Sequence, residues 1–193
     1  MADDIFSGLR SQVSKLVPLT DEEWSLFRTN WEPKELEKGE VATQIGDVEN
    51  YFYYVHEGVI RGYAIKEGED VSIGFSYKGD YSGAYDSLLS RTPSEWCMQA
   101  VTKTSTLRIY FERLHELFDQ HKNFERWGRL FNAQMLMLMS KRQVESRSFS
   151  AEERYDRLMT QSPHLFQLVP QKHIASYLGM TAETLSRLRK RHD

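Results

Sequence analysis

Three residues near the end of the chain have the types and spacing that can read the edge of a base pair. Glu183, Ser186 and Arg187 stand at positions i, i+3 and i+4, which share one face of a helix. An arginine in such a place can donate two hydrogen bonds to guanine O6 and N7, and a glutamate can accept one from a cytosine amino group. Such a face can contact the bases of double-stranded DNA where a helix-turn-helix presents it to the major groove.

Polar and basic residues around this face have the chemistry of phosphate contacts. Basic side chains neutralise phosphates, while hydroxyl and amide groups donate hydrogen bonds to them. The residues that we expect to contact phosphate are Gln171, Thr181, Arg189 and Lys190. The alternative for the basic run is a solvated helix end, because Lys and Arg are favoured near a helix C-terminus.

Two short helices joined by a turn are needed to position these side chains. The first is predicted from Gln171 to Leu178, and Gly179 follows it with the freedom to adopt the left-handed conformation that often ends a helix. Thr181 is a suitable N-cap for the second helix. A glycine-containing turn before a basic helix predicts a helix-turn-helix. Glu183 could instead be a first-turn acid favoured by the helix dipole, but that does not account for Ser186 and Arg187.

The composition excludes several classes of protein. The 193 residues are 40% hydrophobic and 27% charged, and the net charge of −3 argues against general binding to polyanions. The single cysteine, Cys97, excludes a disulfide framework, a cysteine-rich zinc site and a four-cysteine cluster within one chain, and we expect it in the core. No apolar run is long enough to span a membrane, and Met1 to Arg10 lacks the pattern of a signal peptide. We expect a cytoplasmic protein with no membrane, metal or cofactor.

A β domain preceded by helices is expected in the first half of the chain. Apolar residues from Ile5 to Leu16 recur at helical spacing, and Thr20 with Glu23 has the pattern of a capping box. Eight of the eleven glycines lie between Gly39 and Gly83, where they separate short alternating segments. Short strands with glycine turns predict a β-sandwich or barrel over about residues 36–111.

The strands of this domain are predicted from alternation. Two strands are expected around Glu57-Gly58, and another is expected near Leu107 and Ile109. A further strand is expected between Asp70 and Tyr77, with its apolar residues on one face. Those residues are Val71, Ile73, Phe75 and Tyr77.

A long helix is predicted from Asn123 to about Ser146. Its apolar stripe, which we assign to a dimerisation helix, consists of Phe124, Trp127, Phe131, Met135 and Leu138. The run from Met135 to Met139 is apolar on every side, so more than one side should be covered. One side could cover the β domain and the other could meet the same helix of a second chain. The alternative is a helix wholly buried in a monomer, but a helix-turn-helix usually needs two copies to span two half-sites.

The order of these parts resembles the Crp/Fnr family of bacterial transcription regulators. The motifs are KGE at 38–40, Gly46-Asp47, VHEGVIRGY at 55–63, KGDYSGAY at 78–85 and the Glu183, Ser186, Arg187 set. SAEERYDRL and VPQKHIASYLGMT also resemble a short subgroup of Bacteroidetes-type bacteria. The resemblance covers nearly the whole chain and implies an α+β fold. Its parts would be a cyclic-nucleotide-binding-like double-stranded β-helix or jelly-roll with N-terminal helices at 1–122, a dimerisation helix at 123–147 and a helix-turn-helix domain at 148–193.

The resemblance also implies partners. A regulator of this family would bind a pseudo-palindromic operator as a homodimer, with RNA polymerase as a further partner and no enzymatic activity. Many members carry a β-hairpin wing after the helix-turn-helix, and this sequence stops at Asp193 without one. A missing wing would remove phosphate contacts, so we expect weaker or more salt-sensitive binding.

The effector pocket implied by the resemblance is degenerate. Members that bind cyclic AMP use a Gly-Glu pair for the ribose and an Arg-Ser pair for the phosphate. Here these correspond to Gly83-Ala84 and to about Ser94-Glu95, with Arg91-Thr92 nearby as a substitute. Alanine cannot accept the ribose hydrogen bond, and a glutamate repels a phosphate. We therefore expect an effector other than cyclic AMP, of unknown identity.

Two other classes of function fit parts of the sequence. A cupin-type enzyme also has a small β-roll, but it needs a cluster of metal ligands, and His56 is the one histidine in the predicted β domain. The same residue could be an axial haem ligand, although its place before a glycine turn favours a turn or surface role. A small-molecule sensor with a vestigial DNA-binding end is the other alternative, and the intact reading residues argue against it.

Overall fold

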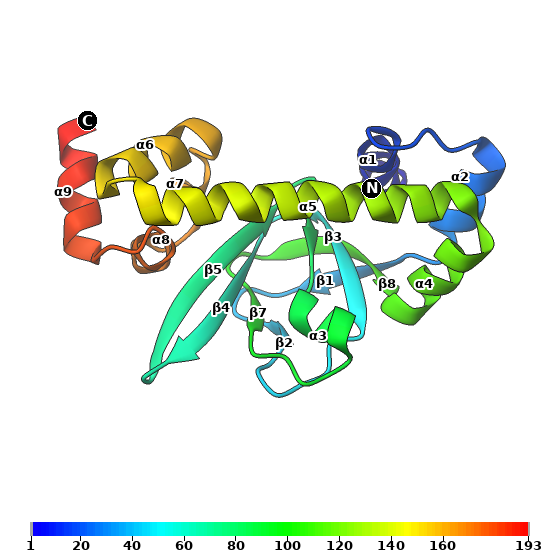
Figure 1. Ribbon diagram of the computed structural model, residues 1–193, viewed down its shortest axis with the longest axis horizontal. Helices are drawn as coiled ribbons and strands as arrows, with labels where there is room; N and C mark the ends of the chain where they lie inside the picture. The colour runs from blue at the N-terminus through cyan, green and yellow to red at the C-terminus, as the bar shows by residue number, and fades with distance from the viewer. Residues whose placement is uncertain (1, 193) are drawn as a thin grey trace.

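The computed structural model describes the backbone of residues 2–192 and the side chains of residues 5–191. Met1 begins the first predicted domain and Asp193 ends the last one, and both residues lie outside the described residues. The described chain forms a β domain, a long helix that passes over it, and a helical unit at the far end of that helix (Figure 1). The predicted α+β class is confirmed.

The strands of the β domain form two antiparallel four-stranded sheets, with the orders β1-β8-β3-β6 and β2-β7-β4-β5. The bounds are β1 (Glu32–Leu36), β2 (Val41–Thr43), β3 (Tyr51–Glu57), β4 (Val59–Lys66), β5 (Glu69–Tyr77), β6 (Tyr81–Ser82), β7 (Cys97–Ala100) and β8 (Thr104–Tyr110). The first strand begins earlier than predicted. It lies at a sheet edge, where Pro33 is tolerated and alternation is not required.

Alternation predicts β8 correctly but fails in the first half of β5. In β5 Ser72 is buried, whereas Val71 is 40% exposed and Ile73 is 38% exposed. The cause is the buried guanidinium of Arg61, whose Nε donates to Ser72 Oγ at 2.7 Å. The pairing of β4 with β5 also shifts between Gly62 and Tyr63. A one-residue shift exchanges the faces of a strand, and nothing in the sequence of β5 itself reveals it.

Helices cover the sheets and form both ends of the molecule. Their bounds are α1 (Ala2–Ser14), α2 (Asp21–Arg28), α3 (Tyr85–Ser90), α4 (Phe111–Gln120), α5 (Lys122–Ser148), α6 (Ala151–Gln161), α7 (Leu165–Leu168), α8 (Gln171–Tyr177) and α9 (Ala182–His192). The capping box of Thr20 with Glu23 is confirmed, and Ser150 forms a second box with Glu153. Neither α3 nor α7 was predicted, because α3 begins after Ala84, which has no capping side chain, and α7 is a single turn.

The first half of α5 packs into an aromatic core. Phe124, Trp127 and Phe131 are all buried there, and the Trp127 ring stacks on Phe131 with centroids 5.4 Å apart. These side chains are buried within the chain that carries them, so a second chain cannot contact them. This part of the stripe therefore covers the β domain, and Met135 and Leu138 at its end line a cavity in the same chain. The dimerisation role of the helix stays a prediction.

The C-terminal helical unit (residues 150–192) packs directly against the β domain, so the two parts are joined by more than the connecting chain. Ser72 donates from its backbone N–H to Ser176 Oγ at 2.9 Å, and the Tyr77 and Ser162 hydroxyls lie 2.5 Å apart. The Phe75 ring lies 5.4 Å from the Tyr177 ring. These contacts fix how α8 sits relative to β5. None of the helices that the structure describes is both long and apolar enough to cross a bilayer.

A test of this fold compares two glycines with positive φ. A Cβ at Gly58 (φ 91°) would lie 2.5 Å from the Lys103 carbonyl oxygen, whereas a Cβ at Gly68 (φ 84°) would meet nothing within 4 Å. Gly68→Ala should cost about 1 kcal/mol from backbone strain, and Gly58→Ala about 2–4 kcal/mol because a clash is added. Urea denaturation measures both. Equal losses would contradict the close approach at the β3–β4 turn.

Candidate functional site

The predicted helix-turn-helix is formed by α8 and α9, and the turn between them donates hydrogen bonds to carbonyl groups at the end of α8. Gly179 has φ 65°, the left-handed value expected from the sequence. Its N–H donates to the Ser176 carbonyl at 3.1 Å, and the Met180 N–H donates to the Ala175 carbonyl at 3.0 Å. These two bonds form a Schellman motif, which closes a helix without exposing its last carbonyls.

The start of α9 is fixed by Thr181. Its Oγ1 accepts a hydrogen bond from the Thr184 N–H at 3.2 Å, as predicted for an N-cap. On the inner face of α9, Leu185 and Leu188 are buried against α6 and α8. The helix is therefore held by apolar contacts on one side, and its other side is free to face a partner.

The three predicted base-reading residues lie together on the outer side of α9. The side chains of Glu183 and Arg187 are 74% and 68% exposed, and they form an ion pair one turn apart. Ser186 is half-buried beside them. An exposed i,i+4 pair is worth about 0.3–0.5 kcal/mol, whereas a good bidentate contact to a base is worth about 1–3 kcal/mol. The ion pair is thus weak enough to open when Arg187 meets a base.

The predicted phosphate contacts are distributed over both helices. Gln171 is exposed at the first position of α8, Lys190 is exposed on α9, and Arg189 is half-buried. Lys172, also exposed in the first turn of α8, was not predicted. The positive charge of Lys172 next to Gln171 is visible in the sequence, but no phosphate contact was predicted for it.

Sequence reasoning also missed Arg154 of α6, which ties the helix-turn-helix to the end of α5. Its Nε donates to the Leu178 carbonyl at 2.8 Å, and its Nη1 donates to the Phe149 carbonyl at 2.6 Å. These two acceptors lie at the turn of the motif and at the last cap of α5. No local pattern reveals such a bridge, because Arg154 and Leu178 are far apart in sequence.

The segment that corresponds to the phosphate-binding cassette is occupied by carboxylates of the chain itself. Glu49 is buried and accepts hydrogen bonds from the N–H groups of Asn50 and Tyr51 and from the Thr43 hydroxyl. It also accepts from the backbone N–H of Ala84, at the start of α3. Burial raises the pKa of Glu49. The backbone N–H groups that could bind an anion at this place are therefore already occupied by Glu49.

Asp86, in the first turn of α3, also accepts hydrogen bonds from this segment. Its carboxylate accepts from Ser94 Oγ at 3.2 Å and from the Glu95 N–H at 2.8 Å. Gly83 packs so closely that an added Cβ would lie 2.8 Å from Leu88 Cδ1. The cassette is therefore closed by internal bonds.

Arg91, the proposed substitute for the missing arginine, is not free to bind phosphate. It donates to the Glu49 carbonyl oxygen and to Asn50 Oδ1, both at 2.8 Å. The hydroxyl groups of Thr92 and Ser90 form a hydrogen bond of 2.6 Å. This geometry supports the expected degenerate pocket.

The described residues contain no group of three or more His, Cys, Asp or Glu side chains that could hold a metal ion. Cys97 is buried, as expected for a core residue, and burial raises the pKa of its thiol. Neither observation supports a metal-dependent reaction of the cupin type.

Comparison with known proteins identifies similar chains. A family model described as cyclic nucleotide-binding domain matches residues 33–121. The Fumarate and nitrate reduction regulatory protein of Escherichia coli (strain K12) is 31% identical over 167 residues, which is 80% of this chain and 66% of that protein. The protein of the same name from Yersinia pestis is 29% identical over 167 residues, with the same coverage of both chains. The chain thus spans just under two thirds of the length of these relatives, and the predicted subgroup stays untested.

Solved structures share the fold at lower identity. FixK2 from Bradyrhizobium japonicum superposes with a TM-score of 0.72 at 20% identity, over 83% of each chain. The Thermus thermophilus Catabolite Activator Protein superposes with a TM-score of 0.57, also at 20% identity, over 90% of this chain and 83% of that one. The relatives are named as regulators, which agrees with the expectation that this chain is not an enzyme.

Replacement of Arg154 tests how the helix-turn-helix is held. Arg154→Met keeps much of the apolar stem but removes the charged donors to Leu178 and Phe149. Loss of such bonds should cost about 1.5–3 kcal/mol and speed amide hydrogen exchange in α8 and α9. Arg147→Met, at an exposed position near the end of α5, is the matched control and should change exchange little. Equal exchange in both variants would refute the bridging role.

Proposed function

The chain belongs to the Crp/Fnr family, and from this premise we propose that it is a sequence-specific, DNA-binding transcription regulator that acts as a homodimer. The observation that carries the proposal is the outer face of α9, which is exposed and held rigidly by the Schellman turn and by Leu185 and Leu188. A rigid, exposed, polar helix face is what reading of a major groove requires.

On an operator, α9 enters the major groove, where some of its side chains contact bases and others contact phosphates. Arg187 donates to guanine O6 and N7, Glu183 accepts from a cytosine amino group, and Ser186 contacts a base edge or a phosphate. Gln171, Lys190, Arg189 and the N–H or hydroxyl of Thr181 position the motif on the backbone, and Lys172 joins this set.

The homodimer is proposed to form through the side of α5 that faces away from the β domain. Ala133, Met137, Ser140 and Val144 repeat there at alternating steps of four, three and four residues. Leu130 precedes them by three residues, at the border where the side chain is half-buried against the aromatic core. The side chains of Met137 and Val144 are 58% and 60% exposed in the single chain. Such spacing forms the seam of a two-stranded coiled coil. The two copies of α9 would then be related by a two-fold axis, which matches a pseudo-palindromic operator.

Within this proposal, residues 1–122 form the sensor unit, 123–147 the dimerisation helix and 148–193 the DNA-binding unit. The effector is proposed to be a molecule other than cyclic AMP, because Glu49 and Asp86 occupy the cassette. We also propose that the protein acts in the cytoplasm, where a bacterial chromosome lies. RNA polymerase is proposed as a further partner.

The alternative function is a small-molecule sensor whose DNA-binding end is vestigial. The presence of Glu183, Ser186 and Arg187 on an exposed helix face, with the turn and the buried leucines that support it, does not favour this alternative. Footprinting of the protein on its own upstream region separates the two functions.

Arg187 and Lys190 give a direct test of base reading. Arg187→Ala should weaken specific binding by about 1–3 kcal/mol and relax preference at one base position. Lys190→Ala should weaken binding to all sequences alike and lower the salt slope by about 1. Fluorescence anisotropy with operator and random duplexes across a salt series measures both. If Arg187→Ala lost equal affinity for operator and random DNA, the assignment of Arg187 would be wrong.

Two methionines of α5 form a matched test of the dimer. Met137 lies within the proposed seam, and Met139, which is 47% exposed, lies to its side. Met137→Glu should shift the protein to monomer, because like charges would meet across a two-fold axis in an apolar seam. Met139→Glu adds the same charge and should leave the dimer intact. Sedimentation velocity reads the outcome, and a dimer that survives Met137→Glu would exclude this interface.

A further inference from the structure

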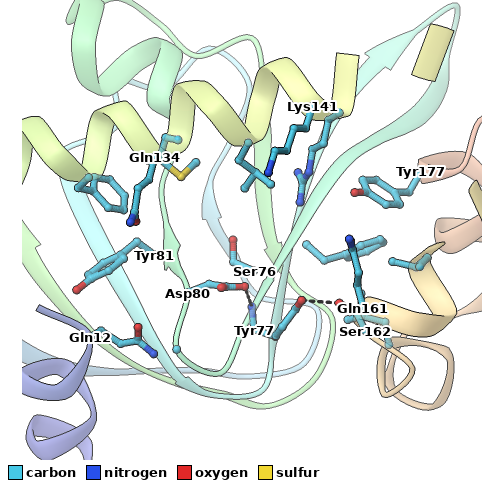
Figure 2. A pocket seen from close by; sticks show the side chains of 18 of the residues that line it. Gln12, Ser76, Tyr77, Asp80, Tyr81, Gln134, Lys141, Gln161, Ser162 and Tyr177 are labelled. Carbon is cyan, nitrogen blue, oxygen red and sulfur yellow. Dashed lines mark hydrogen bonds between the residues drawn. The ribbon is translucent and has the colours of Figure 1, made fainter. Parts of the chain in front are cut away.

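A cavity of about 600 Å³ lies where α5, the edge of the β domain and the C-terminal helical unit meet. Side chains from α1, β5, α5, α6 and α8 line it (Figure 2). The volume falls within the roughly 300–1,000 Å³ that small-molecule sites occupy. None of Gly83, Ala84, Ser94 and Glu95 is among the lining residues, so the cavity is distinct from the closed cassette.

The charged side chains of this interdomain cavity have a positive excess. The basic ones are Lys15, Lys141, Arg142 and Arg157, and the acidic ones are Asp80 and Glu145. Arg157 Nε lies 2.7 Å from Glu145 Oε1, so these two charges compensate each other. Asp80 accepts from the Tyr77 N–H at 3.0 Å, and burial raises the pKa of its carboxyl. Three cations therefore remain against one carboxylate.

Two of these cations are adjacent on α5. Figure 2 shows Lys141 and Gln134 reaching from α5 toward the cavity, with Ser76 of β5 pointing toward them from below. Among the described residues, no carboxylate lies within ion-pair distance of Lys141 or Arg142. The Arg142 guanidinium instead lies 5.7 Å from the centre of the Tyr177 ring. These cations can therefore form charge-assisted bonds with an anion.

Part of the remaining lining is apolar, although several glutamines and serines also belong to it. The apolar part includes Phe131, Met135 and Leu138 of α5 and Leu165 of α7. A bare inorganic anion would leave these surfaces uncovered. The combination favours a ligand that has one acidic group and an apolar body.

We propose that this interdomain cavity binds a small organic anion, with its acidic group on Lys141 and Arg142 and its apolar body against Met135 and Leu138. β5 and α8 both line the cavity, and the Phe75–Tyr177 contact joins them at its wall. A bound molecule that fits one arrangement of these elements better than another shifts the population toward it. Given the proposed function, the ligand would thereby set the orientation of α9 on DNA.

Anilinonaphthalene sulfonate, a fluorescent organic anion with an apolar body, is the probe for the test. Titration into the full chain without DNA should give saturable binding at one site. The double variant Lys141→Glu, Arg142→Glu should weaken it about tenfold or more, as expected when charge-assisted bonds become repulsion. The control pair Lys38→Glu, Lys66→Glu, on exposed lysines outside the cavity, should bind as the parent does. Lys141→Gln, which makes no repulsion, should weaken binding by a smaller factor, and circular dichroism checks folding.

Equal probe affinity in the parent and the cavity variants would overturn the site. A second measurement follows operator affinity with and without saturating probe. We expect a change of about threefold or more in the parent that is absent in the double variant, and an unchanged operator affinity would overturn the coupling to α9. Probe binding without DNA binding would count against the proposed function and leave the site intact.

Discussion

Burial of Trp127 and Phe131 in the aromatic core fixes the axis of α5, and the other functional surfaces are positioned by that axis. Aromatic pairs contribute about 0.5–1.5 kcal/mol each beyond the area that they bury, and several meet here. Gly128 lets the Phe118 ring approach to a distance at which any Cβ would clash. The helix therefore lies closely on the β domain over its first half. Its second half leaves the aromatic core, carries the exposed face that is proposed for the dimer, lines the cavity and leads to the helix-turn-helix.

The sequence predicted best those elements that are fixed by neighbours in the chain. Gly179 and Thr181 define the turn of the helix-turn-helix through bonds that span only a few residues, so their types and spacing were sufficient. Trp127 and Phe131 were correctly assigned to the apolar face of a long helix. Periodicity identifies the apolar face of a helix but not what covers it, and the structure shows that the β domain and the N-terminal helices cover this one. The same limit applies to β5, whose faces are exchanged by the buried charge of Arg61 on a different strand.

The candidate site was predicted in part for the same reason. Glu183, Ser186 and Arg187 share a helix face by spacing alone. Arg154 and the hydroxyl contact of Tyr77 with Ser162 join residues that are 24 and 85 positions apart, respectively. Such contacts depend on how whole elements pack, and no local pattern encodes them. The expected departure from a cyclic AMP cassette rested on Ala84 and Glu95. No pattern in the sequence pointed to Glu49 and Asp86, whose carboxylates accept hydrogen bonds in this segment.

Under the proposed function, the ion pair between Glu183 and Arg187 has a consequence for how the protein would approach DNA. While the two side chains compensate each other, the reading face adds little to the electric field at a distance. Attraction toward the duplex must then come from the flanking cations of α8 and α9, in a chain whose net charge is −3. The rate of association with DNA and the discrimination between base pairs would therefore depend on different side chains. A substitution could alter the association rate without altering the base preference, or the reverse.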